Sequence, residues 1–228
     1  MTPPPFIVAF ALFDRVTQLD FTGPYEVFWR LPGAQCVMAS VDGGEIHADG
    51  GLAIAGVRRL ADVPRADLVC VPGGFGVIEA MENAAYVREV RRLADDARYV
   101  TSVCSGSLIL GAAGLLRGRR AACHWAWRDL LPAFGAVIDE SRVVSDGHVI
   151  TGGGVTAGID MALTVMADVA GTEHAQSVQL GIEYAPAPPF DCGRPERAAP
   201  DILGAVTARL DRLRADRYAA VQRAAQRL

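Results

Sequence analysis

The sequence predicts an α/β fold in which a parallel sheet lies between layers of helices. Several short, continuously apolar runs are typical of strands that are covered on both faces. Amphipathic, helix-like segments separate these runs, and this alternation is the pattern of parallel α/β sheets. The chain has 228 residues, of which 51% are hydrophobic, and this is enough apolar material for one substantial core.

The elements of the first half follow in order. We predict a strand at Phe6–Phe13 (FIVAFALF) and a helix at Gly23–Arg30. A small hairpin is expected at Gly43–Leu52, where glycines are frequent. Asp67–Pro72 is another short apolar run and is predicted to form a strand. Ala85–Ala97 places its apolar residues on one face, which predicts a helix.

The second half continues the alternation. Strands are predicted at Tyr99–Val103 and in the glycine-rich segment Val149–Gly154, which leads into a helix at Thr156–Ala170. Proline-rich Pro186–Pro200 interrupts regular structure, and Ile202–Leu228 has the spacing of one amphipathic helix. We therefore divide the chain into an α/β domain, residues 1–198, and a helical extension, residues 199–228.

The C-terminal segment is rich in arginine, at positions 209, 212, 214, 217, 223 and 227. Asp211 and Asp216 interrupt this basic face, which argues against a nucleic-acid-binding arm. We expect the helix to pack on the domain or on a partner subunit. The net charge of −4 likewise does not indicate a nucleic-acid partner.

Composition also bears on location. Met1–Pro5 lacks the positive charge of a secretory signal, and no apolar stretch is long enough to span a bilayer. The cysteines show neither CxxC pairs nor Cys/His ligand spacing, so we expect neither a zinc site nor a disulfide framework. Reduced thiols favour a cytoplasmic protein. The cysteines are Cys36, Cys70, Cys104, Cys123 and Cys192.

Cys104 stands where the predicted strand Tyr99–Val103 passes into a helix-like segment. Ser105, Gly106 and Ser107 supply small side chains and free backbone N–H groups there. A thiol at a helix start is expected to have a lowered pKa, and the N–H groups could stabilise developing negative charge. Cysteine is also among the most buried residue types, so the local sequence alone leaves a nucleophile and a packing residue open.

The other cysteines are interpreted differently. Cys70 and Cys36 lie in apolar runs and are expected to be structural, whereas Cys123 and Cys192 are left unassigned. His124 stands isolated beside Trp125, which favours a structural role over direct catalysis.

Two further segments should meet Cys104, because ligands bind at the carboxyl ends of strands in such sheets. They contain Asp20, after the first strand, and Gly73-Gly74, after another. Asp20 is a candidate acid, although an aspartate just before Thr22-Gly23-Pro24 also suits a helix cap. The glycines lack the following Gly-Lys-Ser/Thr of a phosphate-binding loop.

The stretch CSGSLILGAAGLL, beginning at Cys104, resembles the nucleophile elbow of the ThiJ/PfpI superfamily, and LDFTGPYEVF (19–28) is similar to one large branch of it. The resemblance extends from about Phe6 to Phe190 and is most specific for the isonitrile-hydrating branch. It implies a flavodoxin-like fold of the class I glutamine amidotransferase type. The stretches that carry it are RYVTSVCSGSLILGAAGLL (98–116), HWAW (124–127), TGGGVTAGIDMALT (151–164) and EYAPAPPF (183–190).

The resemblance implies roles for particular residues. Cys104 would be the nucleophile and Asp20 its acidic partner. A substrate or backbone site would comprise Gly74, Ser105, Gly153, Val155 and Thr156. The branch usually has threonine after its cysteine, whereas this chain has Ser105, which retains the hydroxyl but loses the methyl group that restricts the rotamer.

The implied reaction adds water to an isonitrile, R–NC, and yields an N-substituted formamide through a covalent thioimidate on Cys104. This reaction needs no metal and no organic cofactor. The resemblance implies a homodimer with a small-molecule substrate, without a nucleic-acid or membrane partner. The peptidase-like members have histidine directly after the cysteine, and Ser105 there argues against a protease.

Three alternatives remain open. One is a glyoxalase or deglycase of the same fold that uses the same cysteine and acid. Another is a redox-sensing domain in which Cys104 is oxidised. A structural dimer is the third, and nothing in the sequence points specifically to it. A DNA-binding regulator is not expected, since the segment after the domain is too short to add one.

Overall fold

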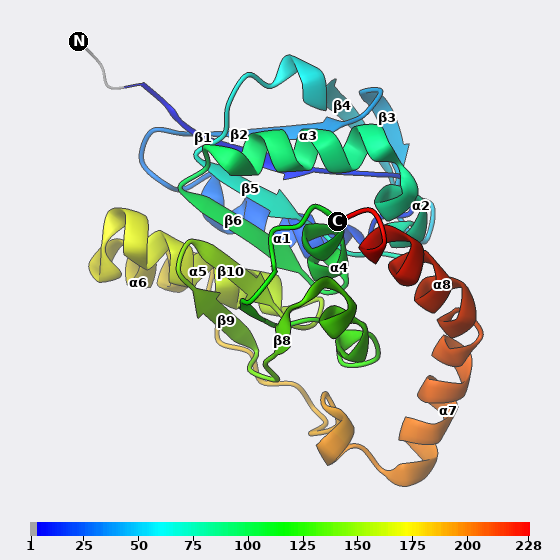
Figure 1. The fold of residues 1–228 in the computed structure, drawn as a ribbon. Coiled ribbons are helices and arrows are strands. Elements are labelled where there is room, and N and C mark those ends of the chain that lie inside the picture. The colour runs from blue at the N-terminus through cyan, green and yellow to red at the C-terminus, as the bar shows by residue number, and fades with distance from the viewer. Residues whose placement is uncertain (1–3) are drawn as a thin grey trace.

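The centre of the molecule is a mostly parallel sheet of eight strands (Figure 1). The structure is a computed structural model that describes residues 4–228, so the first part of Met1–Pro5 lies outside the described residues. The strands of this sheet are β1 (Phe6–Ala11), β2 (Ala34–Ser40), β3 (Gly44–His47), β4 (Ala53–Arg59), β5 (Leu68–Val71), β6 (Tyr99–Val103), β9 (Val143–Asp146) and β10 (Val149–Gly152).

The order across the sheet is β3-β4-β2-β1-β5-β6-β10-β9. All pairings from β4 to β10 are parallel, whereas the edge strands β3 and β9 run antiparallel to their neighbours. The order makes β1, β5 and β6 neighbours, so their carboxyl ends meet at one edge of the sheet. This confirms the predicted α/β class.

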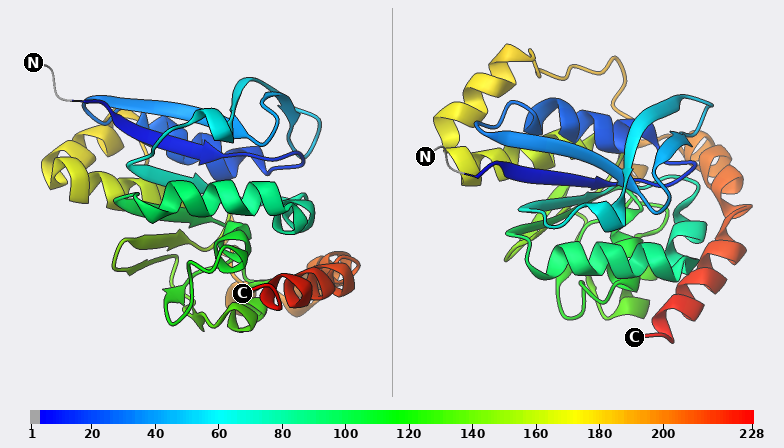
Figure 2. Two further views of the ribbon diagram at one scale, coloured as in Figure 1. Left: turned by 45° about the horizontal axis from the view of Figure 1, so that its top comes forward. Right: turned by 90° about the horizontal axis from the view of Figure 1, so that it is seen from above.

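Helices cover both faces of the sheet (Figure 2). One layer contains α1 (Gln18–Phe28), α5 (Ala157–Ala170) and α6 (Thr172–Gly181), which pack on one another. The other contains α2 (Val77–Glu82), α3 (Ala84–Asp95) and α4 (Gly106–Ala112). The shorter elements are β7 (Arg120–Ala121), β8 (Val137–Ile138) and the 3-10 helices η1 (Leu60–Asp62), η2 (Arg128–Phe134) and η3 (Pro195–Arg197).

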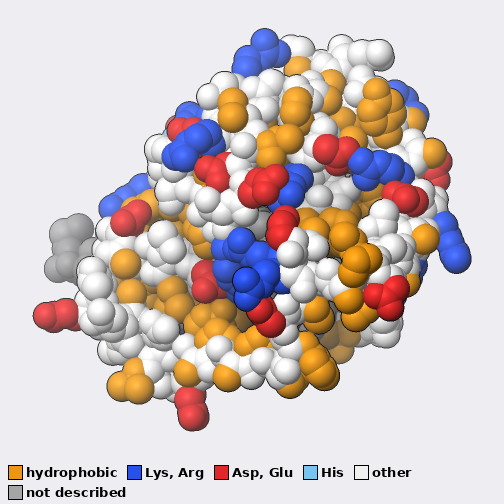
Figure 3. All heavy atoms as spheres, turned by 90° about the horizontal axis from the view of Figure 1, so that it is seen from below, with side chains coloured by type: hydrophobic (Ala, Val, Ile, Leu, Met, Phe, Trp, Pro, Cys, Tyr) orange, Lys and Arg blue, Asp and Glu red, His pale blue; other side chains and the backbone are white. Residues whose placement is uncertain are grey.

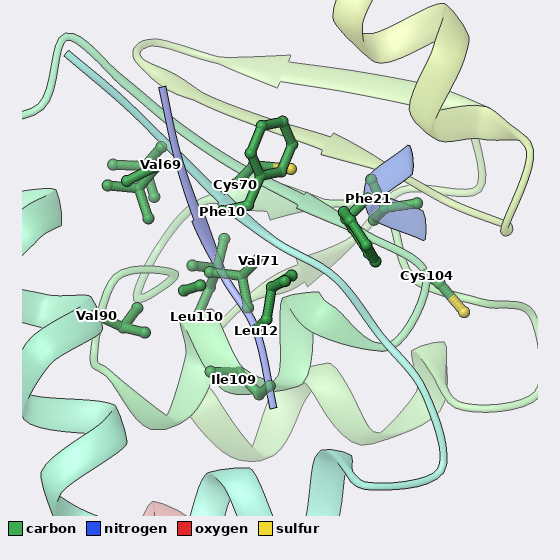
Figure 4. Packing of buried hydrophobic residues seen from close by; sticks show 14 of the residues in the cluster. Phe10, Leu12, Phe21, Val69, Cys70, Val71, Val90, Cys104, Ile109 and Leu110 are labelled. Carbon is green, nitrogen blue, oxygen red and sulfur yellow. The ribbon is translucent and has the colours of Figure 1, made fainter. Parts of the chain in front are cut away.

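The core forms where the apolar central strands meet these helices. Phe10 of β1 and Val69 of β5 are fully buried, as are Ile109 and Leu110 of α4. Each large apolar side chain removed from water contributes about 1.5–3 kcal/mol to stability. Figure 4 shows Cys104 at the edge of this cluster, with its sulfur pointing away from Phe21.

The four strands predicted from apolar runs are all present as β1, β5, β6 and β10. The helices α3 and α5 occupy the predicted helical segments, whereas α1 begins at Gln18, five residues before the predicted start at Gly23. The hairpin differs from the expectation at Gly43–Leu52. Its strands are β3 and β4, and the expected segment covers only the first strand and the turn at Gly50 and Gly51.

The single C-terminal helix expected at Ile202–Leu228 is wrong. The segment forms two helices, α7 (Pro200–Asp211) and α8 (Arg214–Ala225), with a break at residues 212–213 (Figure 1). The break contains neither glycine nor proline, so tertiary contacts must set it. α8 packs against α2, α4 and η2, while α7 has no buried residue.

No helix among residues 4–228 is both long and apolar enough to cross a membrane. Seen from below (Figure 3), the surface carries hydrophobic side chains gathered around hollows, with basic side chains between them.

Candidate active site

Cys104 occupies a strained backbone position between β6 and α4. Its φ of +59° lies in the left-handed region, which costs a residue other than glycine about 1–3 kcal/mol. The tight turn also requires Gly106, since a Cβ there would lie 2.2 Å from the carbonyl oxygen of Val71. Such strain persists only where surrounding contacts hold it.

Hydrogen bonds hold this turn from two sides. The Cys104 N–H donates to the carbonyl oxygen of Gly152 at 3.0 Å. The Cys104 carbonyl oxygen accepts from the His124 N–H and from the Ser107 hydroxyl, each at 3.3 Å. The residue as a whole is 7% exposed. The backbone contacts therefore hold a largely buried cysteine at the wall of a cavity.

Asp20, on α1, lies fully buried behind the cysteine. Its Oδ2 accepts the Gly73 N–H at 2.8 Å, and no hydrogen-bond partner within the described residues reaches Oδ1. Thr17, not Asp20, is the N-cap residue of α1. The helix-cap interpretation of Asp20 is therefore wrong, and its carboxyl group faces the elbow instead.

Gly73 allows the three segments to converge. A Cβ at this position would lie 2.6 Å from the Ser105 nitrogen and 2.9 Å from Asp20 Oδ2. Any larger residue would therefore push the carboxyl group and the elbow apart. The expectation that the segments after β1, β5 and β6 meet at one edge is confirmed.

Burial raises the pKa of Asp20 to about 7, from an ordinary value of 3.8. The Gly73 N–H and the Cys104 side chain lower this pKa, and the charge of Asp49 raises it further. Near neutral pH, Asp20 can therefore both hold and release a proton, which general acid–base chemistry requires.

Burial also raises the pKa of the Cys104 thiol well above its ordinary value, and the nearby charge of Asp20 adds to this. The Ser105 N–H and the charge of Arg217 act in the opposite direction. The lowered thiol pKa expected from the helix start is wrong, because desolvation outweighs the backbone N–H groups of the short α4.

A cavity of about 210 Å³ opens in front of Cys104. Gly74, Ser105 and Val155 line it, as expected for a substrate site, and Arg209 and Arg217 line it from the C-terminal helices. Its apolar wall comes from Phe75, Trp125, Trp127, Val155, Val206 and Leu210.

The remaining predicted site residues lie outside the cavity that contains Cys104. Gly153 and Thr156 line a neighbouring cavity of about 520 Å³ and not the one that contains Cys104. The Gly153 N–H donates to the carbonyl oxygen of Arg142 at 2.9 Å, and the Thr156 hydroxyl accepts from the Arg142 guanidinium at 3.2 Å. The structure therefore places these two in the wall between strand β10 and α5, away from the thiol.

Gly74 and Ser105 are joined by a hydrogen bond from the Gly74 N–H to Ser105 Oγ, at 3.3 Å. This N–H is therefore engaged by a side chain and is not a free donor at the cavity. The Ser105 hydroxyl fixes the segment after β5 against the elbow.

His124 does not form a Cys–His pair. Its Nδ1 accepts the Ala126 N–H at 3.3 Å, and its ring lies 5.5 Å from that of Trp125. Burial lowers the pKa of His124 to about 4, and the charge of Arg217 lowers it further. The ring is therefore neutral at physiological pH and forms part of the cavity wall.

The other cysteines lie apart from this chemistry. Cys70 is fully buried in β5, Cys36 is partly buried in β2, Cys123 is buried beside the larger cavity, and Cys192 is exposed. Within the described residues no group of three or more His, Cys, Asp and Glu side chains is arranged to hold a metal ion.

Sequence reasoning missed Arg217, which it counted among the six arginines of the last helix without giving it a role of its own. The side chain is only 2% exposed. Its spacing carried a signal, because Leu210, Leu213 and Val221 place residue 217 on the apolar stripe of a helix.

Comparisons with known proteins agree with this geometry. Residues 7–168 match the DJ-1/PfpI family. The chain is 51% identical over 191 residues to the isonitrile hydratase of Pseudomonas putida, covering 84% of each protein. A ThiJ/PfpI family protein from Pseudomonas syringae superposes with a TM-score of 0.91 at 35% identity, over 97% of this chain and 90% of that one.

More distant structures share the fold alone. Drosophila melanogaster DJ-1beta superposes with a TM-score of 0.72 at 24% identity, over 80% of this chain and 100% of that one. With the cysteine elbow, the sheet order and the sequence match together, the chain belongs to the DJ-1/PfpI family.

Proposed function

We propose that this protein hydrates isonitriles to N-substituted formamides, with Cys104 as nucleophile and Asp20 as acid and base. The observation that carries the proposal is the buried Asp20–Cys104 pair at the head of an apolar cavity. The 51% identity to an isonitrile hydratase supports the choice of substrate class.

In the first half of the reaction, the Cys104 sulfur attacks the terminal carbon of R–NC. The proton lost by the thiol passes to Asp20, whose raised pKa lets it hold that proton near pH 7. Asp20 then delivers the proton to the same carbon. One S–C bond and one C–H bond form, and the product is the thioimidate R–N=CH–S–Cys104.

In the second half, the Asp20 carboxylate takes a proton from water, and the hydroxide adds to the thioimidate carbon. The nitrogen receives the proton from Asp20. As the C=O bond forms, the S–C bond breaks and the hydroxyl proton returns through Asp20 to the sulfur. The sum is R–NC plus water to R–NH–CHO, with Cys104 and Asp20 restored.

The cavity favours substrates with an apolar R group. Trp125, Trp127 and Leu210 offer an apolar surface, and about 210 Å³ suits a small ring or short chain. Ser105 supports the site by holding Gly74, and Val155 closes one side.

We further propose that the protein is a cytoplasmic homodimer. Five free thiols fit a reducing compartment. Leu180 and Trp29, from α6 and the end of α1, are 81% and 51% exposed and offer apolar surface for a second copy. Light scattering on a size-exclusion column tests the assembly, and a monomer would contradict it.

The deciding experiment measures formamide production from cyclohexyl isonitrile by the wild type and by Cys104→Ala. We expect turnover by the wild type alone. In the wild type, the peptide that contains Cys104 should also form an adduct that is heavier by the mass of one isonitrile molecule. Full turnover by Cys104→Ala would overturn the nucleophile. A folded, reduced wild type that consumes methylglyoxal and no isonitrile would overturn the reaction.

A further inference from the structure

Arg217 is a buried cation without a carboxylate partner. The side chain lies on α8 and is 2% exposed. Its Nη2 donates to the Gly74 carbonyl oxygen at 3.4 Å, and its Cζ lies 4.1 Å from the ring centroid of Trp127. Within residues 4–228, no carboxylate lies within 4.0 Å of the guanidinium, and its Nε has no hydrogen-bond partner.

This arrangement is energetically costly. Arginine is almost never fully buried unless it is paired, because removing a charge from water costs several kcal/mol. One long hydrogen bond and a cation–π contact with Trp127 compensate only partly. A guanidinium does not lose its proton in proteins, so the positive charge persists.

The unpaired charge lies in the same cavity as the reacting sulfur. Arg217 and Cys104 line the same cavity of about 210 Å³, and α8 packs on α4, directly after the elbow. Figure 1 shows α8, in red, next to this end of the sheet. Cys104 is the neighbouring ionisable group that would favour the charged form of Arg217 most, and Arg217 in turn lowers the pKa of Cys104, although less than burial raises it.

We propose that Arg217 is a positioning residue that stabilises negative charge on the Cys104 sulfur, so that α8 supplies an electrostatic part of the active site. For its effect on turnover, this inference rests on the proposed function. Its effect on the thiol does not, because an opposite charge near a buried thiol favours the thiolate whatever the substrate.

Other groups near the sulfur do not supply this charge. His124 is neutral, Arg209 is an exposed side chain at the rim, and the Ser105 N–H carries only a partial charge. Asp20 and Cys123 oppose the thiolate. Arg217 also lies beyond residues 7–168, where the sequence matches the family. The other titratable or charged groups that act on Cys104 or on Arg217 are Asp20, Asp49, Glu79 and Cys123. His124 and Arg209 line the same cavity.

The test is the pH dependence of Cys104 alkylation by iodoacetamide, measured peptide by peptide by mass spectrometry. Arg217→Met removes the charge with little change in volume, and Arg217→Lys replaces the guanidinium with an ammonium group that burial makes easier to deprotonate. The matched control is Arg223→Met, on the same helix, where the guanidinium pairs with Glu82 outside the cavity. Alkylation of the exposed Cys192 is the internal reference.

We expect Arg217→Met to raise the pH midpoint of Cys104 alkylation by about one unit or more. Arg223→Met should stay close to the wild type, and Arg217→Lys should lie between the wild type and Arg217→Met, because a buried lysine loses its proton more easily than an arginine. With cyclohexyl isonitrile, Arg217→Met should lower kcat at least about tenfold and change KM less than about threefold. Circular dichroism verifies folding, and Arg217→Gln, which keeps a donor for Gly74, replaces the methionine variant if that does not fold.

A folded Arg217→Met or Arg217→Gln protein with an unchanged midpoint would overturn the inference. An equal shift in Arg223→Met would also overturn it, because the effect would then come from the docking of α8. If the midpoint shifts while the wild type turns over no isonitrile, the proposed function fails and the role of Arg217 stands.

Discussion

At the scale of single residues, the site is built at the expense of stability. Cys104 has a strained φ, Asp20 is a fully buried carboxyl group, and Arg217 is an unpaired cation. Each feature would be removed by selection for stability alone, and their coincidence around one cavity is typical of functional sites.

Asp20→Asn should therefore stabilise the protein at neutral pH. Between pH 3.8 and about 7 the folded wild type holds a proton on Asp20 that the unfolded chain has lost. The stability of the wild type consequently falls as pH rises through this window, by up to about 4 kcal/mol at 1.36 kcal/mol per unit. The free energy of unfolding, measured in urea at pH 4.5, 6 and 8, should therefore increase for Asp20→Asn relative to the wild type as pH rises.

The same substitution should reduce isonitrile turnover by at least about a hundredfold, since the amide can neither hold nor release the proton. A stability difference that is independent of pH would show that Asp20 is ionised in the folded protein throughout. Retained turnover would remove Asp20 from the proposed mechanism.

Ser105→Ala tests the hydroxyl that follows the cysteine. Loss of Ser105 Oγ leaves the buried Gly74 N–H without its acceptor, which should cost about 1–3 kcal/mol. Ser105→Thr keeps the hydroxyl and should lie near the wild type. Ser107→Ala is the control, because the Cys104 carbonyl oxygen still accepts from the His124 N–H. Equal midpoint temperatures of thermal unfolding for Ser105→Ala and Ser107→Ala would contradict this account.

At the scale of elements, the central strands could be predicted because they are apolar without interruption. β1, β5 and β6 are buried on both faces, so no other structure suits their sequences. β4 could not be found in this way, since most of its residues are exposed. α6 carries only a weak apolar stripe and is held by its contacts with α5.

The same distinction explains which site residues were found. Cys104 and Asp20 follow strands whose carboxyl ends must meet, so topology and motif identify them together. Arg217 reaches the site only because residues 212–213 break the last helix and direct α8 onto α4. That break depends on long-range contacts, for which the local sequence has no signal.

Packing between elements predicts opposite effects for two helical glycines. A Cβ at Gly111 of α4 would lie 2.3 Å from the Phe134 ring of η2, whereas nothing lies within 4 Å at Gly204 of α7. Overpacking in Gly111→Ala should lower the free energy of unfolding by about 1–3 kcal/mol, which exceeds the gain of about 1 kcal/mol from the higher helix propensity of alanine. Gly204→Ala should be more stable than the wild type by about 1 kcal/mol, because the added methyl group meets no neighbour. Thermal unfolding measures both, and a stabilised Gly111→Ala would refute the close contact.

At the scale of the whole molecule, the C-terminal extension packs on the surface of the domain and supplies part of the wall of the cavity that contains Cys104. α7 exposes nearly all of its length, while α8 buries Ala220, Val221 and Ala224 against the domain. Arg214 and Arg223 bind Asp129 and Glu82 at its two ends. We propose that residues 199–228 are an extension that completes the cavity of an otherwise self-contained domain, residues 1–198.

Ala220→Phe tests this division, because the fully buried Ala220 leaves no room for a ring and α8 must move away. We expect turnover to fall at least about tenfold, as Arg217 is withdrawn, and limited proteolysis to cut within residues 182–213. Calorimetry should still show one main cooperative transition from the sheet domain. Ala215→Phe, on the exposed side of the same helix, should leave all three measurements unchanged. If Ala220→Phe abolishes the cooperative transition, α8 is instead an integral part of the core that the sheet needs in order to fold.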